Sequence, residues 1–406
     1  MLDEVDQRSN ELSIDRQLKL ISRTEANGMP LAEVLEGNGF TYDDLRYVRS
    51  RELVWDGPPA NDLTEFKRRP NDIPVVSFFT GCGGMDLGFE AAGFSHVAAF
   101  EFNELFCKTL RKNRPDWNVF GPPVHSGDVS KVGEVTDALS RLISSPFEGV
   151  FIGGPPCQPF SIAANQRFAK WGDKFKRTGF SHETNGGLLF DYVEIIRSFK
   201  PSVFIIENVP GLRDIDDGAQ LSEAMQALRA AGYSLETPTV LDAADYEIPQ
   251  QRLRLFVVGN RRGKQFVYPR ASLRRIGAGA VLSDRAPNAA NNETRRHNAG
   301  SIVRYMRLDY GSRDQLGRVD RLNPAIPSKT FIAGGSGGGG RSHLHPEIPR
   351  TLSVRECARL QSFPDDYVFA GPTARQFTQV GNAVAPRFAE YLGKFLVSLD
   401  KEICHR

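Results

Sequence analysis

The chain of 406 residues lacks long hydrophobic runs, a secretory signal and closely spaced cysteines. No apolar run approaches the roughly 20 residues that a membrane-spanning helix needs. The opening stretch MLDEVDQRSN is too polar and acidic for a secretory signal. The five cysteines are scattered and never form a C-x-x-C pair, which argues against a disulfide framework and a structural zinc site. We therefore expect a cytoplasmic protein without a membrane segment.

Net charge is also small, although it is unevenly distributed. The formal charge is +2, and the contents of 25% charged and 40% hydrophobic residues are those of an ordinary globular protein. Residues 261–321 differ, because thirteen arginines and one lysine face five acidic residues there, a net of +9. Such a basic, irregular segment is typical of a polyanion contact, and a solvated charged surface is an equal alternative.

Residues 1–70 are expected to form a short helical extension. The stretches PLAEVLEGNGF and TYDDLRYVRSREL each carry apolar residues at helical spacing. Thr41 followed by Asp44 resembles a capping box in which aspartate replaces the usual glutamate. This pattern favours a helical hairpin packed on the main body over a helix–turn–helix that binds DNA.

From Pro74 onward, short apolar runs alternate with helical patterns. The runs VVSFF, HVAAFEF, GVFIGG, VFIIENV and RLRLFVVGN lack strict polar alternation, as strands covered on both faces do. The order predicts an α/β fold with a doubly wound, mostly parallel, Rossmann-like sheet. We expect a catalytic and cofactor-binding domain of residues 71–260 plus 373–406, and a smaller irregular domain of residues 261–372.

The first strand leads into a glycine-rich turn, SFFTGCGGMDLGF, and then a helix. Glycines let the backbone and a helix N-terminus approach a ligand closely. Glu101 ends the second expected strand, about 20 residues later, where a ribose hydroxyl acceptor belongs. Asp128 lies where a third strand would end, suited to an adenine amino group. This layout predicts an adenosine-bearing cofactor without a pyrophosphate.

A second group of residues points to the same sheet edge. In GGPPCQPFS, prolines stiffen the loop around Cys157 just after a buried strand, which favours a nucleophile over a structural cysteine. Glu207 emerges from the apolar VFIIENV, where partial desolvation would raise its pKa and favour a protonated hydrogen-bond donor. Arg252 and Arg254 lie two residues apart on one strand and could hold a polar ring or a phosphate.

Together these stretches resemble the cytosine-C5 DNA methyltransferase family. The resemblance covers about Val75 to the C-terminus and rests on FFTGCGGMDLGFEAAGF, GGPPCQPFS, ENVPGL, QQRLRLFVVG, RECARLQSFPDDY and QVGNAVAP, in this order. One departure is Ser77, where many relatives have aspartate, which puts a hydrogen bond that supports the loop in doubt. The resemblance implies S-adenosylmethionine as methyl donor, held by Phe79, Gly81, Cys82, Gly84, Glu101, Phe102, Asp128, Val129, Leu189, Asn382 and Ala383.

The resemblance also implies the roles of the catalytic residues. Cys157 would attack carbon 6 of cytosine, Glu207 would contact ring N3, and Arg252 and Arg254 would form the arginine pair of the active site. No step needs a metal, and we expect His343 and His345 to be loop residues.

The target base must leave the duplex stack to be reached. A basic loop with Arg167, Lys170, Lys174, Lys176 and Arg177 would close on the DNA backbone, and residues 261–372 would recognise the target sequence. We expect a monomer that binds double-stranded DNA in a restriction–modification or defence context. The sequence leaves open whether a cognate restriction endonuclease accompanies it.

Three alternatives stay open at this point. The same chemistry could act on a transfer-RNA cytosine, as in a related subfamily. The chain could be a catalytically silent DNA-binding regulator, although Cys157, Glu207 and both arginines are intact. A cysteine hydrolase would leave the cofactor-type loop unexplained.

Overall fold

The computed structural model describes residues 12–49, 72–156, 187–264, 266–272, 274–282, 289–317, 319–331 and 343–400. Its centre is one eight-stranded sheet in the order β3-β2-β1-β4-β5-β8-β6, with β7 also paired to β8. The five strands from β3 to β5 are parallel, and β8, β6 and β7 join antiparallel. The strands are β1 (Pro74–Phe78), β2 (Ser95–Phe100), β3 (Val119–Phe120), β4 (Val150–Gly153), β5 (Val203–Asn208), β6 (Ser234–Leu235), β7 (Thr239–Asp242) and β8 (Leu253–Asn260).

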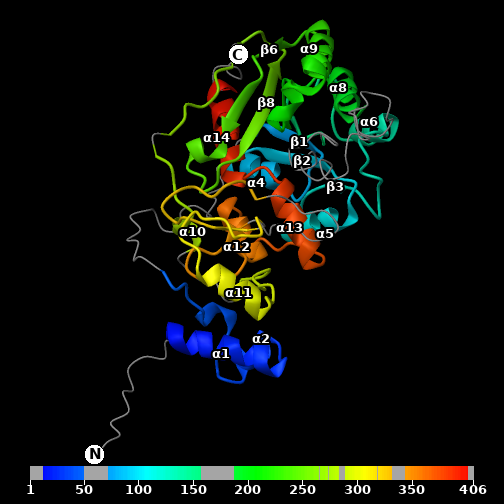
Figure 1. Cartoon of the computed structure of the whole chain (residues 1–406). Helices are drawn as coiled ribbons and strands as arrows, with labels where there is room; N and C mark the ends of the chain where they lie inside the picture. The colour runs from blue at the N-terminus through cyan, green and yellow to red at the C-terminus, as the bar shows by residue number, and fades with distance from the viewer. Residues whose placement is uncertain are drawn as a thin grey trace, which may run out of the picture.

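Helices cover both faces of this sheet, which confirms the predicted doubly wound, mostly parallel fold (Figure 1). Successive strand residues point to opposite faces, so Val75 and Ile205 join one apolar cluster while Val76 and Phe204 join the other. The first cluster contains α4 (Gly84–Ala91) and α14 (Pro386–Asp400). The second contains α6 (Val132–Leu139), α8 (Gly187–Phe199) and α9 (Ala219–Ala230).

The contact between α4 and α14 depends on small residues. A Cβ atom at Gly88 would lie 2.2 Å from the Pro386 carbonyl oxygen and 2.5 Å from the Ala389 Cβ. Glycine therefore allows the C-terminal helix to lie directly on the helix that follows β1, although these helices are about 300 residues apart in sequence.

Below the sheet in Figure 1 lies a second body with little regular strand structure. Its strands β9 (Asp320–Arg321) and β10 (His343–Leu344) form a short parallel pair. Its helices are α10 (Gly279–Leu282), α11 (Ala299–Met306) and α12 (Val354–Leu360). We expected residues 261–321 to be irregular because they show little periodicity. This expectation missed α11, a short helix that buries Ile302, Tyr305 and Met306.

Two further helices lie beside this body and the sheet. They are α5 (Glu104–Asn113), after β2, and α13 (Thr373–Asn382), which packs on α12. Four short 3-10 turns complete the described elements: Tyr42–Asp44, Pro210–Arg213, Ile215–Gly218 and Ala243–Tyr246.

The N-terminal residues form α1 (Ile14–Asn27) and α2 (Leu31–Glu36), which lie next to α11 at the lower end of the molecule (Figure 1). The Thr41–Asp44 capping box is present, but it caps only a single 3-10 turn. The expected helix through TYDDLRYVRSREL is therefore wrong for residues 45–49. This stretch is not helical because it packs on the rest of the protein. Leu45 is buried, and the Val48 N–H donates to the Met306 carbonyl at 2.9 Å.

Candidate active site

Several of the predicted site residues that the structure describes lie at the edge where the parallel strands end. The strand order places β1 between β2 and β4, and chain connections leave β1 and β4 in opposite directions along the sheet. Doubly wound sheets bind ligands in the crevice at such a point, outside the carboxyl ends of the strands. The described residues that directly follow β1, β2, β4 and β5 therefore start from one common edge.

The loop after β1 has an unusual backbone. Phe79, Gly81 and Gly83 have φ angles of 54°, 61° and 82°, in the left-handed region that favours glycine. The Ser77 hydroxyl lies 3.0 Å from the Thr80 hydroxyl in this loop. Serine at position 77, where many relatives have aspartate, thus still forms a side-chain hydrogen bond that supports the turn.

Glu101 follows β2 directly and fixes this loop. Its buried carboxylate accepts hydrogen bonds from the Gly81 and Asn103 backbone N–H groups, each at 2.7 Å. Burial raises the pKa of the Glu101 carboxyl to about 7, although those N–H groups oppose the shift. The neighbouring Phe102 ring is 65% exposed and is free to stack on a planar ligand.

Cys82 and Gly84 meet the segment that follows α13. The buried Cys82 thiol donates to the Gln379 carbonyl at 3.3 Å, and burial raises its pKa, so it is a packing residue. A Cβ at Gly84 would lie 2.2 Å from the Val384 carbonyl oxygen, so only glycine fits there. This packing brings Asn382, which is exposed, and the mostly buried Ala383 beside the first loop.

Gln379 is a supporting residue of this site that the sequence reasoning missed. Its side chain accepts from the Thr109 hydroxyl at 2.5 Å and donates to the Ala370 carbonyl at 2.8 Å. Gln379 belongs to the stretch QVGNAVAP, on which the family resemblance partly rests, and this membership was the sequence signal that could have identified it.

Asp128 lies further from its strand than expected. The third strand ends at Phe120, and a loop of seven residues separates it from Asp128, so the expected strand-end position is wrong. The Asp128 carboxylate accepts from the Ser130 N–H at 3.0 Å. Val129 and Leu189 are buried in one apolar cluster nearby. Burial, with Asp128 close by, raises the pKa of Asp191, a carboxyl that the sequence reasoning did not select.

Glu207 and Arg254 form a close ion pair at the carboxyl end of β5. The Arg254 Nε lies 2.7 Å from the Glu207 Oε1, and the two side chains are 13% and 12% exposed. Burial raises the pKa of Glu207, as predicted, while the arginines oppose the shift. The antiparallel pairing of β8 with β5 is what brings Arg254 to this edge.

Arg252 is fully buried just before β8. Its Nη2 donates to the Gly381 carbonyl at 2.8 Å, whereas its Nε and Nη1 have no hydrogen-bond partner among the described residues. Burial lowers the pKa of the guanidinium, and the nearby Arg254 lowers it further. Both amide atoms of the buried Gln250 likewise lack a partner within the described part of the chain. These orphaned polar groups are what a polar ligand would satisfy.

Cys157 lies outside the described residues, as do Arg167, Lys170, Lys174, Lys176 and Arg177 of the expected basic loop. The residues just before Cys157 are described and lie against Glu207. A Cβ at Gly154 would be 2.8 Å from the Glu207 Oε2, and the Asn208 amide donates to the Pro155 carbonyl at 3.0 Å. The chain thus enters the cysteine segment beside the Glu207–Arg254 pair.

A family model described as C-5 cytosine-specific DNA methylase matches residues 73–398, which include every part of this edge. The chain belongs to this family. It is therefore an enzyme of the class that methylates carbon 5 of cytosine in DNA.

Several type II methyltransferases are similar to this DNA methylase over most of its length. M.Eco47II of Escherichia coli is 33% identical over 371 residues, which cover 84% of this chain and 83% of the relative. M.PspPI of Psychrobacter sp. (strain TA137) is 30% identical over 389 residues, with coverage of 89% and 87%.

Solved structures show the same fold. A DNA modification methyltransferase encoded within an E. coli prophage has 23% identity and a TM-score of 0.66, and the match covers 81% of this chain and 100% of that one.

The arginine-rich segment of this methylase is less exposed than its sequence suggests. Arg321 is buried, and Arg261 and Arg262 pair with Glu148 at the edge of the sheet. Arg275 pairs with Asp245. Ion pairs thus neutralise part of the +9 charge, although the Arg262 and Arg275 side chains are 38% and 48% exposed. Further exposed arginines are Arg270, Arg274, Arg295, Arg296 and Arg307.

Of the two histidines of HLHP, which were expected to be loop residues, His345 lies in a loop and His343 does not. His343 lies in β10, and both His343 and His345 are buried. Burial lowers the pKa of His345 to about 4, so the ring is neutral near pH 7. Among the described residues, no cluster of metal-binding side chains occurs and no helix is long and apolar enough to cross a membrane.

Proposed function

We propose that this methylase modifies cytosine in a specific duplex DNA sequence with Cys157 as nucleophile and Glu207, Arg252 and Arg254 as its partners. The observation that carries the proposal is the Glu207–Arg254 ion pair, which lies directly against the backbone that leads into Cys157. A carboxyl with a raised pKa beside an arginine can hold a proton toward ring N3 while the arginine pair stabilises negative charge at O2.

Carbon 5 of cytosine is a poor nucleophile, so the chemistry begins at carbon 6. The Cys157 thiolate adds there, which forms the S–C6 bond and moves electron density to carbon 5. Glu207 and the arginine pair stabilise the charge that develops on N3 and O2. After carbon 5 has been methylated, a base takes up the carbon-5 proton, and the S–C6 bond breaks to release the thiolate and restore the ring.

Enzymes of this family depend on S-adenosylmethionine, and the first loop fits such a cofactor. Glu101 keeps acceptor capacity for ribose hydroxyls, Phe102 offers an exposed ring to adenine, and Asp128 can accept from an adenine amino group. When bound, S-adenosylmethionine supplies a methyl group activated by a sulfonium centre. The remaining residues assigned to this site are Phe79, Gly81, Cys82, Gly84, Val129, Leu189, Asn382 and Ala383.

Residues 261–372 are assigned to target recognition, residues 71–260 with 373–406 to catalysis, and residues 1–70 to an N-terminal extension. Exposed arginines in the recognition region suit phosphates and bidentate contacts to guanine. The named relatives are type II methyltransferases, which supports a restriction–modification role with a cognate endonuclease. The protein would act as a cytoplasmic monomer without a metal.

The test compares Cys157→Ser with Cys404→Ser, a cysteine that no part of the proposal uses. We expect Cys157→Ser to lose tritiated methyl incorporation into duplex DNA and to lose the covalent adduct with 5-fluorocytosine DNA, while Cys404→Ser keeps both. Turnover by Cys157→Ser at the parent rate would refute the proposal. Faster methylation of transfer RNA than of duplex DNA would favour the RNA alternative, and bisulfite sequencing identifies the target sequence.

A further inference from the structure

The N-terminal segment, residues 12–49, is built into the recognition region rather than onto the sheet. Leu20, Ile21 and Leu35 pack in one apolar cluster with Ile302 of α11 and Leu344 of β10. This cluster is separate from the other three apolar clusters, two of which lie on the faces of the main sheet while the third joins α12 and residues 276–282 to the loop after β1 and to α5. The segment therefore extends the core of the recognition region.

Polar contacts reinforce this attachment at several points. The Tyr47 hydroxyl donates to the His345 carbonyl at 2.8 Å. The buried Arg321 guanidinium lies between the rings of Tyr47 and Tyr310, at 3.5 and 3.9 Å from their centroids, and donates to the Arg49 carbonyl at 2.8 Å. A desolvated cation between two rings fixes the relative position of both chain segments.

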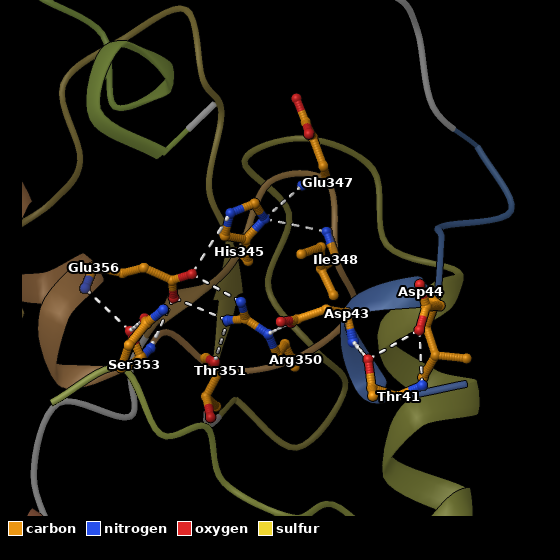
Figure 2. A network of polar contacts seen from close by, with 12 residues as sticks. Thr41, Asp43, Asp44, His345, Glu347, Ile348, Arg350, Thr351, Ser353 and Glu356 are labelled. Carbon is orange, nitrogen blue, oxygen red and sulfur yellow. Dashed lines mark hydrogen bonds and ion pairs between the residues drawn. The ribbon is translucent and has the colours of Figure 1, made fainter. Parts of the chain in front are cut away.

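Arg350 connects the N-terminal segment to α12 (Figure 2). Its Nε donates to the Asp43 carboxylate at 2.6 Å, and its two terminal nitrogens donate to both oxygens of Glu356 at 2.8 and 2.9 Å. The Arg350 side chain is only 4% exposed, whereas Asp43 is 45% exposed. One guanidinium thus bridges two carboxylates that are more than 300 residues apart in sequence.

The α12 helix continues this connection to the cofactor edge. Glu356 lies in its first turn and forms a capping box with Ser353, so its position defines how the helix begins. At the other end, the Gln361 amide donates to the Val380 carbonyl of α13 at 2.5 Å. The α13 helix ends at Asn382, beside the loop after β1.

We propose that Arg350 is a positioning residue, which uses Asp43 of the N-terminal segment to hold the recognition region, through its helix α12, in the orientation that binds duplex DNA. The inference rests on the proposed function, because it takes residues 261–372 as the DNA-recognition region. The N-terminal segment is then part of the DNA-binding apparatus, although none of its residues has to contact DNA.

Asp43 is the residue to change, since its loss leaves Arg350 paired with Glu356 and the α12 cap intact. Asp44 provides a matched control. Its carboxylate accepts from the Thr41 N–H and hydroxyl at 2.7 and 2.9 Å, within the N-terminal segment itself. Asp43→Asn and Asp44→Asn therefore remove the same charge from adjacent residues, but only the first turns the ion pair with Arg350 into a neutral hydrogen bond, and Asp43→Lys removes that contact altogether.

The experiment measures the DNA affinity of the full-length protein for two short duplexes. One contains the target site, as mapped by bisulfite sequencing, and the other is the same duplex with one base pair changed. We expect Asp43→Asn to weaken binding of the cognate duplex about threefold and Asp43→Lys about tenfold, with a smaller cognate-to-altered ratio. KM for DNA should rise in parallel. The kcat at saturating DNA and the Kd for S-adenosylmethionine should stay within about twofold of the parent.

Unchanged DNA affinity and selectivity in both Asp43 variants, with only a lower melting temperature, would show a purely structural brace and overturn the proposal. An equal loss in Asp44→Asn would overturn it as well. Absence of methylation by the parent would instead refute the proposed function. In that case, the affinity of the same variants for sheared genomic duplex DNA decides the positioning role separately.

Discussion

Replacing Glu101 by Gln tests the assignment of the cofactor loop most directly. The Glu101 carboxylate accepts from the Gly81 and Asn103 N–H groups, both at 2.7 Å, while it is only 4% exposed. A glutamine has one carbonyl oxygen, so one of these N–H groups would face an amide NH₂ group instead of an acceptor. Because Gly81 is held at a φ of 61°, the loop after β1 would lose its main anchor.

The expected magnitude follows from these two bonds. A hydrogen bond to a charged group contributes about 1.5–3 kcal/mol, so the loss of one corresponds to roughly a 10- to 100-fold weaker Kd for S-adenosylmethionine. Isothermal titration calorimetry measures this Kd, and thermal unfolding without cofactor reports the change in the fold. The control is Glu104→Gln, which alters an exposed carboxylate three residues further along the chain. In the described structure this carboxylate pairs only with Lys108, so the variant should leave the Kd for S-adenosylmethionine unchanged.

The raised pKa of Glu101, about 7, adds a pH signature. The ionised carboxylate is the better acceptor for ribose hydroxyls, so cofactor affinity should increase in the parent from about pH 6 to about pH 8 and stay flat in Glu101→Gln. The folded-state pKa lies above the ordinary value of 4.5, so the contribution of Glu101 to stability without cofactor is present below pH 4.5 and is lost as pH rises through 7. Equal Kd values for parent and variant, or a flat pH profile in the parent, would refute the assignment.

Two further predictions concern buried titratable side chains. Arg252→Met should reduce methyl transfer at least about a hundredfold but leave the melting temperature unchanged or higher, because it removes a buried guanidinium with two unpaired nitrogens. Calorimetry and tritium incorporation check this, and a clearly lower melting temperature would contradict it. The pKa of His345 is lowered to about 4, so the neutral ring contributes about 3 kcal/mol of folding stability that is lost as pH falls from about 6.5 to about 4. The difference in urea unfolding between the parent and His345→Gln isolates this effect from that of Glu101, and identical pH profiles would contradict it.

The sheet and the residues at its edge could be predicted because their signals are local. Apolar runs such as VFIIEN define strands, and glycines at a strand end indicate a turn close to a ligand. Glu101 directly follows β2 and Glu207 lies near the end of β5, so the parallel order of the strands was enough to bring them to one edge. Asp128 shows the limit of this reasoning, since a loop of unpredicted length intervenes after β3.

The recognition region was poorly predicted because its structure depends on contacts between distant segments. Buried Arg321 and Arg350 look like surface charges in the sequence, and partners that are distant in sequence, such as Tyr47 for Arg321 and Asp43 for Arg350, satisfy them in the fold. His345 is buried for the same reason, beneath a segment some 300 residues away in sequence.

The sequence alone determined the doubly wound sheet, the cofactor loop and the chemistry expected of Cys157, because the residues involved are neighbours along the chain. Tertiary structure alone decided that Arg254 pairs with Glu207, that α14 lies on α4, and that the N-terminal segment packs on α11 and β10. Each of these contacts forms because side chains from distant parts of the chain become buried against one another. Burial is a property of the folded chain rather than of any short stretch of it.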